Sequence, residues 1–314
     1  MRPAQPMHPA AAGPQVQEPA CAFSVDVEDY FQVHAFERYV SCDEWERYPS
    51  RVESNTQRLL DLCDETHATG TFFVLGWLAR RHPALVREIT ARGHEVASHG
   101  MAHRMITRLS PEEFRRDAGE SRQLLEDVSG ARVRGFRAPS YSVTERTLWA
   151  LDVLLEAGYE YDSSIYPIRR RRYGYPKGPV RPERLAGTRG TIVEFPLPTI
   201  PFGPLRLPVL AGAYLRLLPL WVSRAALHAH VSRNIPVVVN IHPWEIDPAQ
   251  PTVGPSRFRT WTHYTRLGHA EGIVRRVLQD ARFRGIGERL RELGLLDPEP
   301  VSPAEPCVPT QRAP

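Results

Sequence analysis

Two histidines stand four residues apart in the sequence, at His99 and His103. On a helical turn, residues four apart lie on the same face, so both imidazoles could bind one metal ion. A zinc protease with such a pair would carry a glutamate directly after the first histidine. This chain has Gly100 there, which disfavours that class. The pair by itself is weak evidence for a metal site, because two solvated histidines can have the same spacing.

An acidic cluster could complete such a site, at Asp26, Glu28 and Asp29. Residues 26 and 28 fall on the same face of an extended chain, while Asp29 can turn toward them where the strand ends. Carboxylates this close repel each other, and a divalent cation would relieve the repulsion. Two histidines and one carboxylate leave positions open for water and substrate, which is typical of a catalytic metal. The alternative is an acidic strand end that caps the next helix.

Two further residues could assist these groups. Arg137 follows an apolar strand, and a buried guanidinium there needs a carboxylate, for which Asp26 is the obvious candidate. An ordinary structural ion pair is the alternative. His242 ends another apolar run and has Trp244 close by. A histidine at such a place is equally compatible with a hydrogen-bonded structural role.

The elements that must position these residues alternate between strands and helices. Apolar, β-branched runs predict strands, and apolar residues at helical spacing behind capping signals predict helices. The expected strands span residues 21–27, 70–75, 95–97, 133–136, 158–161, 191–195 and 236–241, and the expected helices span 54–66, 83–92, 111–128, 144–157, 221–233, 262–280 and 287–293. This alternation predicts an α/β fold with a parallel sheet, and the number of units suggests a barrel.

The chemically capable side chains gather where the predicted strands end. They are Asp26, Glu28, Asp29, His99, His103, Arg137, Asp162 and His242. Because the carboxyl ends of parallel strands share one face, we expect these residues to meet in one active site.

The composition limits the classes of partner. The chain has 314 residues, a net charge of +4 and 42% hydrophobic residues, enough for a folded core. All but one of its 40 basic residues are arginine, which codon bias explains better than a phosphate-binding surface, so we expect no nucleic-acid partner. The arginines at 169–172 are either a solvated loop or a site for an anion or lipid headgroup. Four scattered cysteines without CxxC spacing indicate no zinc knuckle or disulfide framework.

Proline marks the segments outside the regular core. The chain has 30 prolines, about twice the usual share, and many lie near the termini and in residues 166–208. We expect disordered tails at 1–20 and 297–314 around a single domain at 21–296. This domain would carry a Pro- and Arg-rich insertion near 166–222 and a helical C-terminal extension.

The sequence gives no sign of a membrane span or a signal peptide. The N-terminal residues have no apolar run, and the longest apolar stretch, 205–222, is interrupted by arginines and prolines. We therefore expect a cytoplasmic protein. The insertion near 166–222 could be a lid over a substrate groove, an amphipathic piece resting on the inner membrane, or a structural insertion.

Six motifs resemble the polysaccharide deacetylase family (NodB homology, carbohydrate esterase type) over about residues 21–245. In order, they are SVDVEDYF, GTFFVLGWLARRHP, GHEVASHGMAH, GFRAPSYS, EYDSS and NIHPWE. The opening DVEDYFQ, the ending HPWEID and the arginine-rich C-terminal helix resemble the branch found beside exosortase and exopolysaccharide gene clusters. The resemblance implies a distorted (β/α) barrel with fewer than eight regular strands.

The resemblance also implies a role for each residue of the metal site. In that family an aspartate acts as catalytic base and is followed by a metal-binding acid. Asp26 matches the base. The family more often has two adjacent aspartates, whereas a valine intervenes here, so Glu28 matches the metal-binding acid, with Asp29 as the alternative. His99 and His103 match the metal-binding histidines.

The remaining motifs imply the rest of the machinery. Arg137 matches the arginine that orients the base, His242 matches the general acid, and Asp162 matches the acid that tunes this histidine. Tyr141 and Trp244 are candidates for binding a sugar ring, with core packing as the alternative for Trp244.

The implied activity is a metal-dependent hydrolase that removes N-acetyl groups from N-acetylhexosamine units. The divalent metal would be Zn²⁺, which histidine–carboxylate ligation favours. The expected substrate is an acetylated exopolysaccharide or its lipid-linked oligosaccharide precursor, reached by peripheral association with the inner membrane. A cyclic amide, imide or O-acetyl hydrolase of the same fold and a catalytically silent glycan-binding scaffold are the alternatives. The oligomeric state is not decided by the sequence.

Overall fold

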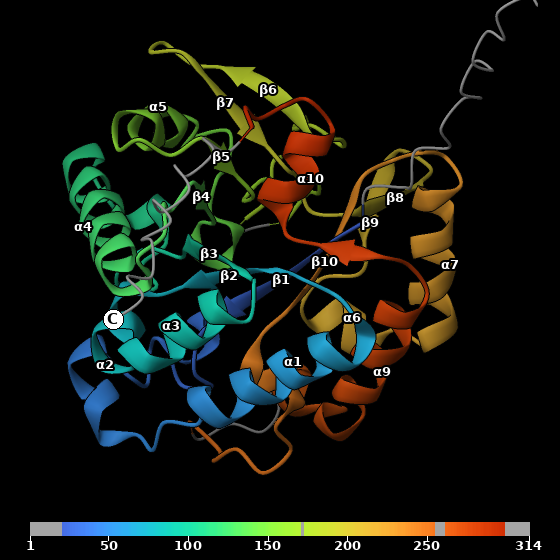
Figure 1. Cartoon of the computed structure of the whole chain (residues 1–314), viewed down its shortest axis with the longest axis horizontal. Coiled ribbons are helices and arrows are strands. Elements are labelled where there is room, and N and C mark those ends of the chain that lie inside the picture. Colours follow the sequence, from blue (N-terminus) through green and yellow to red (C-terminus); the bar gives the residue numbers. More distant parts are fainter. Residues whose placement is uncertain (1–20, 171–172, 255–260, 299–314) are drawn as a thin grey trace, which may run out of the picture.

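The computed structural model describes residues 21–170, 173–254 and 261–298 (Figure 1). The tail expected at 1–20 lies outside the described residues, as does the tail at 297–314 except for its first two residues. Of the arginine cluster, Arg169 and Arg170 are described.

The centre of the molecule is a sheet that the described residues build from nine strands. In spatial order they are β10 (Val237–Ile241), β1 (Cys21–Val27), β2 (Thr71–Val74), β3 (Glu95–Ser98), β4 (Gly135–Phe136), β5 (Tyr161–Asp162), β7 (Thr191–Glu194) and β6 (Glu183–Ala186), with β11 (Phe283–Arg284) beside the start of β1. All neighbours from β10 to β7 are parallel, and β6 pairs antiparallel with β7. Among the described residues the end strands β10 and β6 do not pair. The sheet is therefore a curled half-barrel, which confirms the predicted α/β fold and distorted barrel.

Helices surround this sheet (Figure 1). They are α1 (Val52–Thr66), α2 (Gly76–Arg81), α3 (Pro83–Ala91), α4 (Pro111–Ser129), α5 (Trp149–Glu156), α6 (Ala213–Leu217), α7 (Leu220–Val231), α8 (Trp261–Tyr264), α9 (Leu267–Gln279) and α10 (Ile286–Glu292). Short 3₁₀ turns are η1 (His34–Phe36), η2 (Cys42–Arg47), η3 (Ile106–Arg108), η4 (Pro139–Tyr141) and η5 (Pro243–Ile246).

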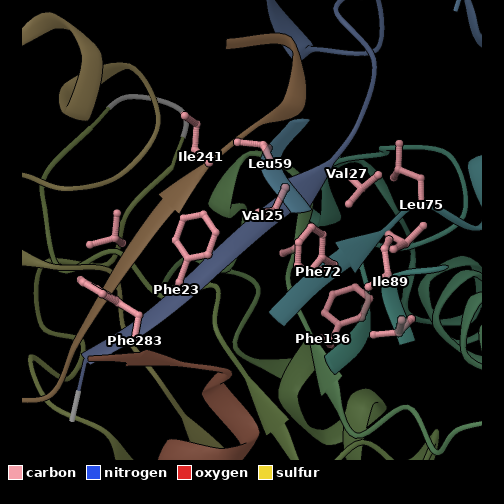
Figure 2. Close-up of a cluster of buried hydrophobic side chains, with 14 of the residues drawn as sticks. Phe23, Val25, Val27, Leu59, Phe72, Leu75, Ile89, Phe136, Ile241 and Phe283 are labelled. Atoms are coloured by element: carbon pink, nitrogen blue, oxygen red, sulfur yellow. The ribbon is translucent and has the colours of Figure 1, made fainter. Parts of the chain in front are cut away.

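The alternation of side chains along β1 decides which residues enter the half-barrel. Phe23, Val25 and Val27 belong to the apolar cluster that packs between the sheet and the helices (Figure 2). Ser24 and Asp26 alternate with them and so point to the opposite face. Each buried Phe or Val contributes about 1.5–3 kcal/mol. The apolar face therefore fixes the register that keeps Asp26 inside the curl.

Two predicted helices differ from the structure. The helix expected at 144–157 begins only at Trp149, because Thr147 accepts and donates hydrogen bonds that close a turn before it. The helix expected at 262–280 is two helices, α8 and α9, because Arg266 between them adopts a left-handed backbone with φ 60°.

The segment near 166–222 is more structured than its proline content predicts. It contributes β6 and β7 to the main sheet, the separate antiparallel hairpin of β8 (Thr199–Phe202) and β9 (Leu205–Pro208), and helix α6. Among all the helices that the described residues form, none has the length and apolar character needed to span a bilayer.

Candidate active site

The carboxyl ends of the parallel strands surround a pocket of about 430 Å³. Its lining includes Asp26, Glu28, His99, His103, Tyr141, His242 and Trp244, so the structure brings together most of the site residues that the sequence predicts. Asp29, Arg137 and Asp162 do not line the pocket, and each has a different set of contacts.

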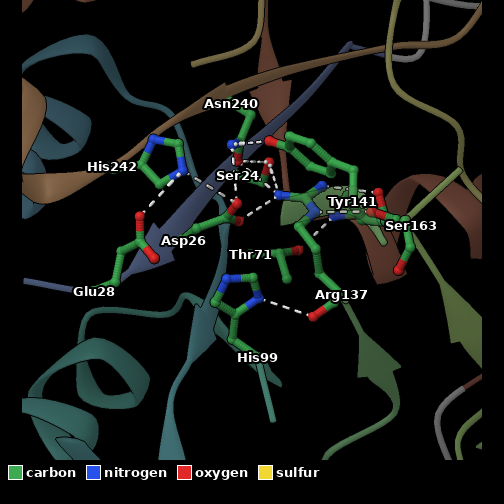
Figure 3. Close-up of polar contacts among 12 residues, drawn as sticks. Ser24, Asp26, Glu28, Thr71, His99, Arg137, Tyr141, Ser163, Asn240 and His242 are labelled. Carbon is green, nitrogen blue, oxygen red and sulfur yellow. Dashed lines mark hydrogen bonds and ion pairs between the residues drawn. The ribbon is translucent and has the colours of Figure 1, made fainter. Parts of the chain in front are cut away.

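Arg137 is buried behind the pocket and holds Asp26 (Figure 3). Its Nη1 donates to Oδ1 of Asp26 at 2.7 Å, and its Nε and Nη2 donate to the carbonyl and hydroxyl oxygens of Ser163 at 2.9 and 2.8 Å. The guanidinium carbon also lies 4.0 Å from the centroid of the Phe73 ring. These contacts give the fully buried guanidinium both a counter-charge and a fixed orientation.

Asn240 is a member of this network that sequence reasoning missed. Its side-chain nitrogen donates to Oδ2 of Asp26 at 3.2 Å and to the hydroxyl of Tyr141 at 2.8 Å, while its oxygen accepts from Arg137 at 2.6 Å. Ser24, its neighbour in the register of β1 and β10, donates to the same oxygen at 2.7 Å. Asn240 could have been identified from the sequence, because it is the one polar residue in the apolar run PVVVNI. A buried polar side chain needs hydrogen-bond partners.

The surroundings of Asp26 favour its ionised form. Burial by itself would raise the pKa of this carboxyl, but the guanidinium of Arg137 and the neighbouring histidines together hold the pKa below its ordinary value. Oδ1 is occupied by Arg137, and Oδ2 lies on the side of His242, at 3.6 Å from Nε2. Asp26 can therefore accept a proton in the pocket.

Glu28, His99 and His103 form a cluster whose ligand atoms all lie within 4.8 Å of one another. Nδ1 of His99 is 2.8 Å from the carbonyl oxygen of Arg137, which leaves the other ring nitrogen for a ligand. Burial lowers the pKa of His99 to about 4, so its ring is neutral, as a metal ligand must be. Nε2 of His103 lies 2.8 Å from Oε2 of Glu28. This donor set suits a divalent metal ion.

The two histidines come together on a turn with left-handed residues, and their spacing is not that of the helical turn considered from the sequence. Gly100 has φ 75° and His103 has φ 51°, so the chain reverses between the two imidazoles. A Cβ at Gly100 would lie 2.7 Å from Oδ1 of Asp117, which leaves no room for a side chain. The carbonyls of Gly100 and Met101 accept the first backbone N–H groups of α2, which fixes this turn in place.

Trp244 holds Glu28. Its indole Nε1 donates to Oε1 of Glu28 at 3.0 Å, and its ring stacks against the rings of His242 and His263, at centroid distances of 5.2 and 4.0 Å. Only 7% of Trp244 is exposed. Burial would raise the pKa of Glu28, but His103 and the other histidines lower it well below its ordinary range. Trp244 is therefore placed to orient the carboxylate of Glu28. It exposes too little of its ring to stack on a sugar.

Asp29 lies outside the metal cluster. Its Oδ2 accepts hydrogen bonds from the hydroxyl of Ser50 at 2.7 Å and from the backbone N–H groups of Arg51 and Val52 at 2.9 and 3.3 Å. These groups form the N-terminus of α1, where a carboxylate is stabilised by the free N–H groups. Asp29 therefore caps this helix, which corrects the alternative that it binds the metal.

His242 is paired with Glu245, which sequence reasoning also missed. Nδ1 of His242 lies 2.7 Å from Oε1 of Glu245, and Nε2 lies 3.6 Å from both Asp26 and Glu28. Burial by itself would lower the pKa of His242. The carboxylates of Glu28, Glu245 and Asp26 outweigh burial and raise that pKa to about 9. His242 therefore carries a proton at neutral pH.

Arg216, from α6 in the segment near 166–222, completes this pair. Its Nε donates to Oε2 of Glu245 at 3.0 Å, and both side chains are fully buried. Its Nη2 donates to the carbonyl of Thr262 at 3.0 Å, and its Nη1 donates to the carbonyl of Thr265. Burial would raise the pKa of Glu245, but His242 and Arg216 hold it below its ordinary value.

The predicted pairing of Asp162 with His242 is therefore wrong, because Glu245 holds that position. Asp162 lies on β5 opposite Glu194 of β7, and its Oδ1 accepts from the hydroxyl of Ser164 at 2.5 Å. Burial raises the pKa of Asp162 to about 6, and burial together with Asp162 raises the pKa of Glu194 well above its usual range. Neither carboxyl lines the pocket, and their burial next to each other disfavours the ionisation of both.

Comparison with known proteins relates both halves of the chain to family models. Residues 43–161 match the model for polysaccharide deacetylase, and residues 163–291 match a domain of unknown function, DUF3473. The candidate site draws on both, since His99 and Arg137 lie in the first segment and His242 in the second. Asp26 and Glu28 precede the first match.

The curated relatives match over about a third of the chain. The chitooligosaccharide deacetylase of Rhizobium leguminosarum bv. trifolii is 31% identical over 109 residues, which cover 31% of this chain and 51% of the relative. That of Sinorhizobium fredii is 35% identical over 100 residues, which cover 32% of this chain and 44% of the relative. The chain thus spans about half the length of the curated relatives it matches.

The fold as a whole is also found in a solved structure. A Mycobacterium smegmatis protein assigned as a polysaccharide deacetylase superimposes with a TM-score of 0.59 over 95% of this chain and 99% of its own, at 23% sequence identity. The family match and the curated relatives together show that residues 43–161 carry a polysaccharide deacetylase domain, and the solved structure shows that its fold extends over nearly the whole chain.

Proposed function

We propose that this protein is a metal-dependent hydrolase that removes the N-acetyl group from N-acetylhexosamine units of a polysaccharide or its precursor. The observation that carries the proposal is the position of His242, whose Nε2 lies 3.6 Å from both Asp26 and Glu28. One pocket thus holds an ionised carboxylate, a protonated imidazole and a set of metal ligands, which are the groups that amide hydrolysis requires.

The donor set fits a zinc ion. Two imidazoles and one carboxylate are ligands that Zn²⁺ prefers, and three protein ligands leave a position for water or substrate. The contacts around the cluster, from Trp244 to Glu28 and from His99 to the carbonyl of Arg137, are the outer contacts that orient such ligands. When bound, the ion would polarise the acetamide carbonyl and make a nearby water more acidic.

Asp26 acts as the general base in this proposal. Arg137 and Asn240 fix its carboxylate and keep it ionised, so that Oδ2 can take a proton from the attacking water. The hydroxide adds to the acetamide carbon. A carboxylate held in place before reaction contributes about 10²- to 10⁴-fold to the rate.

His242 acts as the general acid. Breaking the C–N bond requires a proton on the leaving nitrogen, because an amide anion is too unstable to depart. Nε2 of His242 faces the pocket and carries the proton that Glu245 helps to retain. Proton transfer from His242 yields the free amino sugar, and the acetyl group leaves as acetate.

The segment near 166–222 forms one wall of the substrate groove in this proposal. Tyr166, Tyr173 and Tyr214 from this segment line the pocket beside Tyr141. Aromatic rings at a pocket wall suit the apolar faces of sugar rings. Chitooligosaccharide deacetylases among the relatives support an N-acetylated glycan, and the sequence resemblance favours an exopolysaccharide or its lipid-linked precursor.

We also propose peripheral contact between this segment and a membrane. Phe202 and Leu205 of the β8–β9 hairpin are 65% and 53% exposed, and Trp221 at the start of α7 is 72% exposed. Exposed aromatic and aliphatic residues of this kind suit the interface of a bilayer. Flotation with liposomes of mixed neutral and anionic lipids tests this. We expect the full chain to float and the double variant Phe202→Ser/Trp221→Ser to remain at the bottom of the gradient. A wild-type protein that does not float contradicts the membrane contact.

The activity is tested by acetate release from a panel of N-acetylated oligosaccharides. We expect acetate from N-acetylhexosamine substrates, loss of activity with a chelator and recovery with added Zn²⁺. Asp26→Asn should lower kcat by about 10²- to 10⁴-fold while leaving bound metal unchanged. If the protein releases acetate only from O-acetylated sugars, or hydrolyses only cyclic amides, the proposed reaction is wrong. The enzyme would then be one of the alternative hydrolases that share this fold. No turnover of any substrate by the metal-loaded protein would contradict catalysis.

A further inference from the structure

A second pocket, of about 680 Å³, adjoins the active-site pocket. The two share three lining residues, His34, Met105 and Tyr173, so they lie side by side. The second pocket lies between η3 and the segment that leads into α5. A single acetylated sugar fits in the first pocket, and the second has room for the next part of the glycan.

The second pocket is lined by three arginines, Arg108, Arg146 and Arg170. The carboxylate in its lining belongs to Glu145, and the ammonium of Lys177 lies 2.9 Å from it. The wall therefore carries a net positive charge even before Lys177 is counted.

The arginines differ in their partners. Arg108 pairs with Glu37. Arg170 donates to the hydroxyl of Tyr214 at 3.0 Å, and Tyr214 lines the active-site pocket. Arg146 is exposed and forms no ion pair with any other residue that the structure describes. Arg146 and Arg170 are therefore available to bind an anion in the second pocket.

We propose that this second pocket binds an anionic group, a carboxylate or a phosphate, carried by the glycan next to the sugar that is deacetylated. The inference rests on the proposed function and adds the substrate class to it. Guanidinium groups match the geometry of carboxylate and phosphate oxygens, which accept two parallel hydrogen bonds from one arginine. A neutral glycan would leave the guanidinium groups of Arg146 and Arg170 without this use.

The first arm of the experiment measures binding without turnover. The full chain carrying Asp26→Asn, loaded with Zn²⁺, is titrated calorimetrically with three tetrasaccharide probes. These are tetra-N-acetylchitotetraose (called chitotetraose below), a tetrasaccharide of alternating N-acetylglucosamine and glucuronate, and chitotetraose with a phosphate monoester at its reducing end. We expect at least one anionic probe to bind about fivefold tighter than chitotetraose or better, and the advantage to shrink with added salt. The preferred probe identifies the carboxylate or the phosphate as the ligand.

The second arm assigns the preference to the arginines. In the same background, Arg146→Ala should cost the anionic probe about fivefold in affinity and leave chitotetraose unchanged, and Arg146→Lys should restore part of the loss. The double variant Arg146→Ala/Arg170→Ala should abolish the preference. Arg87→Ala is the matched control, since Arg87 is exposed on α3 and lines neither pocket.

The outcomes separate this inference from the proposed function. Equal affinity for all three probes, or an anion preference that survives the double variant, would overturn the anionic subsite. Acetate release from chitotetraose by the wild-type protein tests the deacetylase activity separately, so an inactive protein that still prefers the anionic probe retains the subsite and loses the proposed reaction.

Discussion

Nδ1 of His242 lies 2.7 Å from Oε1 of Glu245, three residues further along the chain. Glu245 in turn accepts from Nε of Arg216 at 3.0 Å, and both of these partners are fully buried. The turn η5 thus presents the histidine to the pocket and supplies the carboxylate that keeps it protonated. This local pair takes the place that the sequence resemblance gives to Asp162.

Glu245→Gln tests this pairing through the pH dependence of the reaction. The pKa of His242 is raised to about 9, with Glu245 among its causes, so the proposed general acid is protonated below that pH and loses its proton above it. Removing the charge of Glu245 lowers this pKa. We expect the alkaline limb of the kcat/KM profile to move down by about one pH unit, equivalent to about 1.4 kcal/mol. An unchanged limb in a variant with wild-type Tm would show that Glu245 does not support the acid. Asp162→Asn should leave the limb in place.

Trp244→Phe tests the contact between the indole and Glu28. Phenylalanine keeps a ring to stack against His242 and His263 but removes the N–H that Oε1 of Glu28 accepts. Loss of such an outer contact weakens metal binding by about 10- to 100-fold. Competition with a chelator of known affinity measures this change. Trp221→Phe, at an exposed tryptophan, is the control and should bind metal as the wild type does.

His99→Ala tests the metal cluster itself. The substitution removes one of the three proposed metal ligands, and two protein ligands bind Zn²⁺ only weakly. We therefore expect bound Zn²⁺ to fall to background and acetate release to disappear. Metal content is read by mass spectrometry of the dialysed protein. His228→Ala removes an exposed histidine on α7 and should retain the metal. Full activity in His99→Ala would mean that the metal assignment is wrong.

Glu194→Gln tests the interaction between the neighbouring carboxyls of Asp162 and Glu194. Both pKa values are raised in the folded protein, that of Asp162 to about 6, so the folded state holds protons that the unfolded chain releases above about pH 4. Stability is therefore present at low pH and is lost as the pH rises through the folded pKa values. Glutamine can donate to Asp162 without titrating.

We expect Glu194→Gln to be clearly more stable than the wild type at pH 8, and to gain little at pH 4.5. Denaturant unfolding at the two pH values measures the difference. Glu183→Gln, at an exposed position on β6, should behave as the wild type at both. A variant that is less stable than the wild type at pH 8 would contradict this interaction between the two carboxyls.

The sequence by itself determined most of the core strands and helices and most of the residues of the candidate site. The apolar runs predicted strands such as β1 and β10 to within a residue, because a strand buried on both faces has an unmistakable composition. The polar residues directly after these runs marked the pocket, since parallel strands end at one face. Asp26, His99 and His242 needed no more than this to be found.

Only the tertiary structure decided which of these groups touch one another. Asn240 reaches Asp26 across 214 residues of sequence, because β10 pairs with β1 and places Asn240 opposite Ser24. Arg216 reaches Glu245 from a proline-rich segment whose pattern predicted no helix. Asp162 ends strand β5 instead of following it, its partner in the register is Glu194, and Glu245 takes the place beside His242. Local spacing sets which residues share a face, whereas the pairing of distant strands sets the charges that each carboxylate and histidine meets.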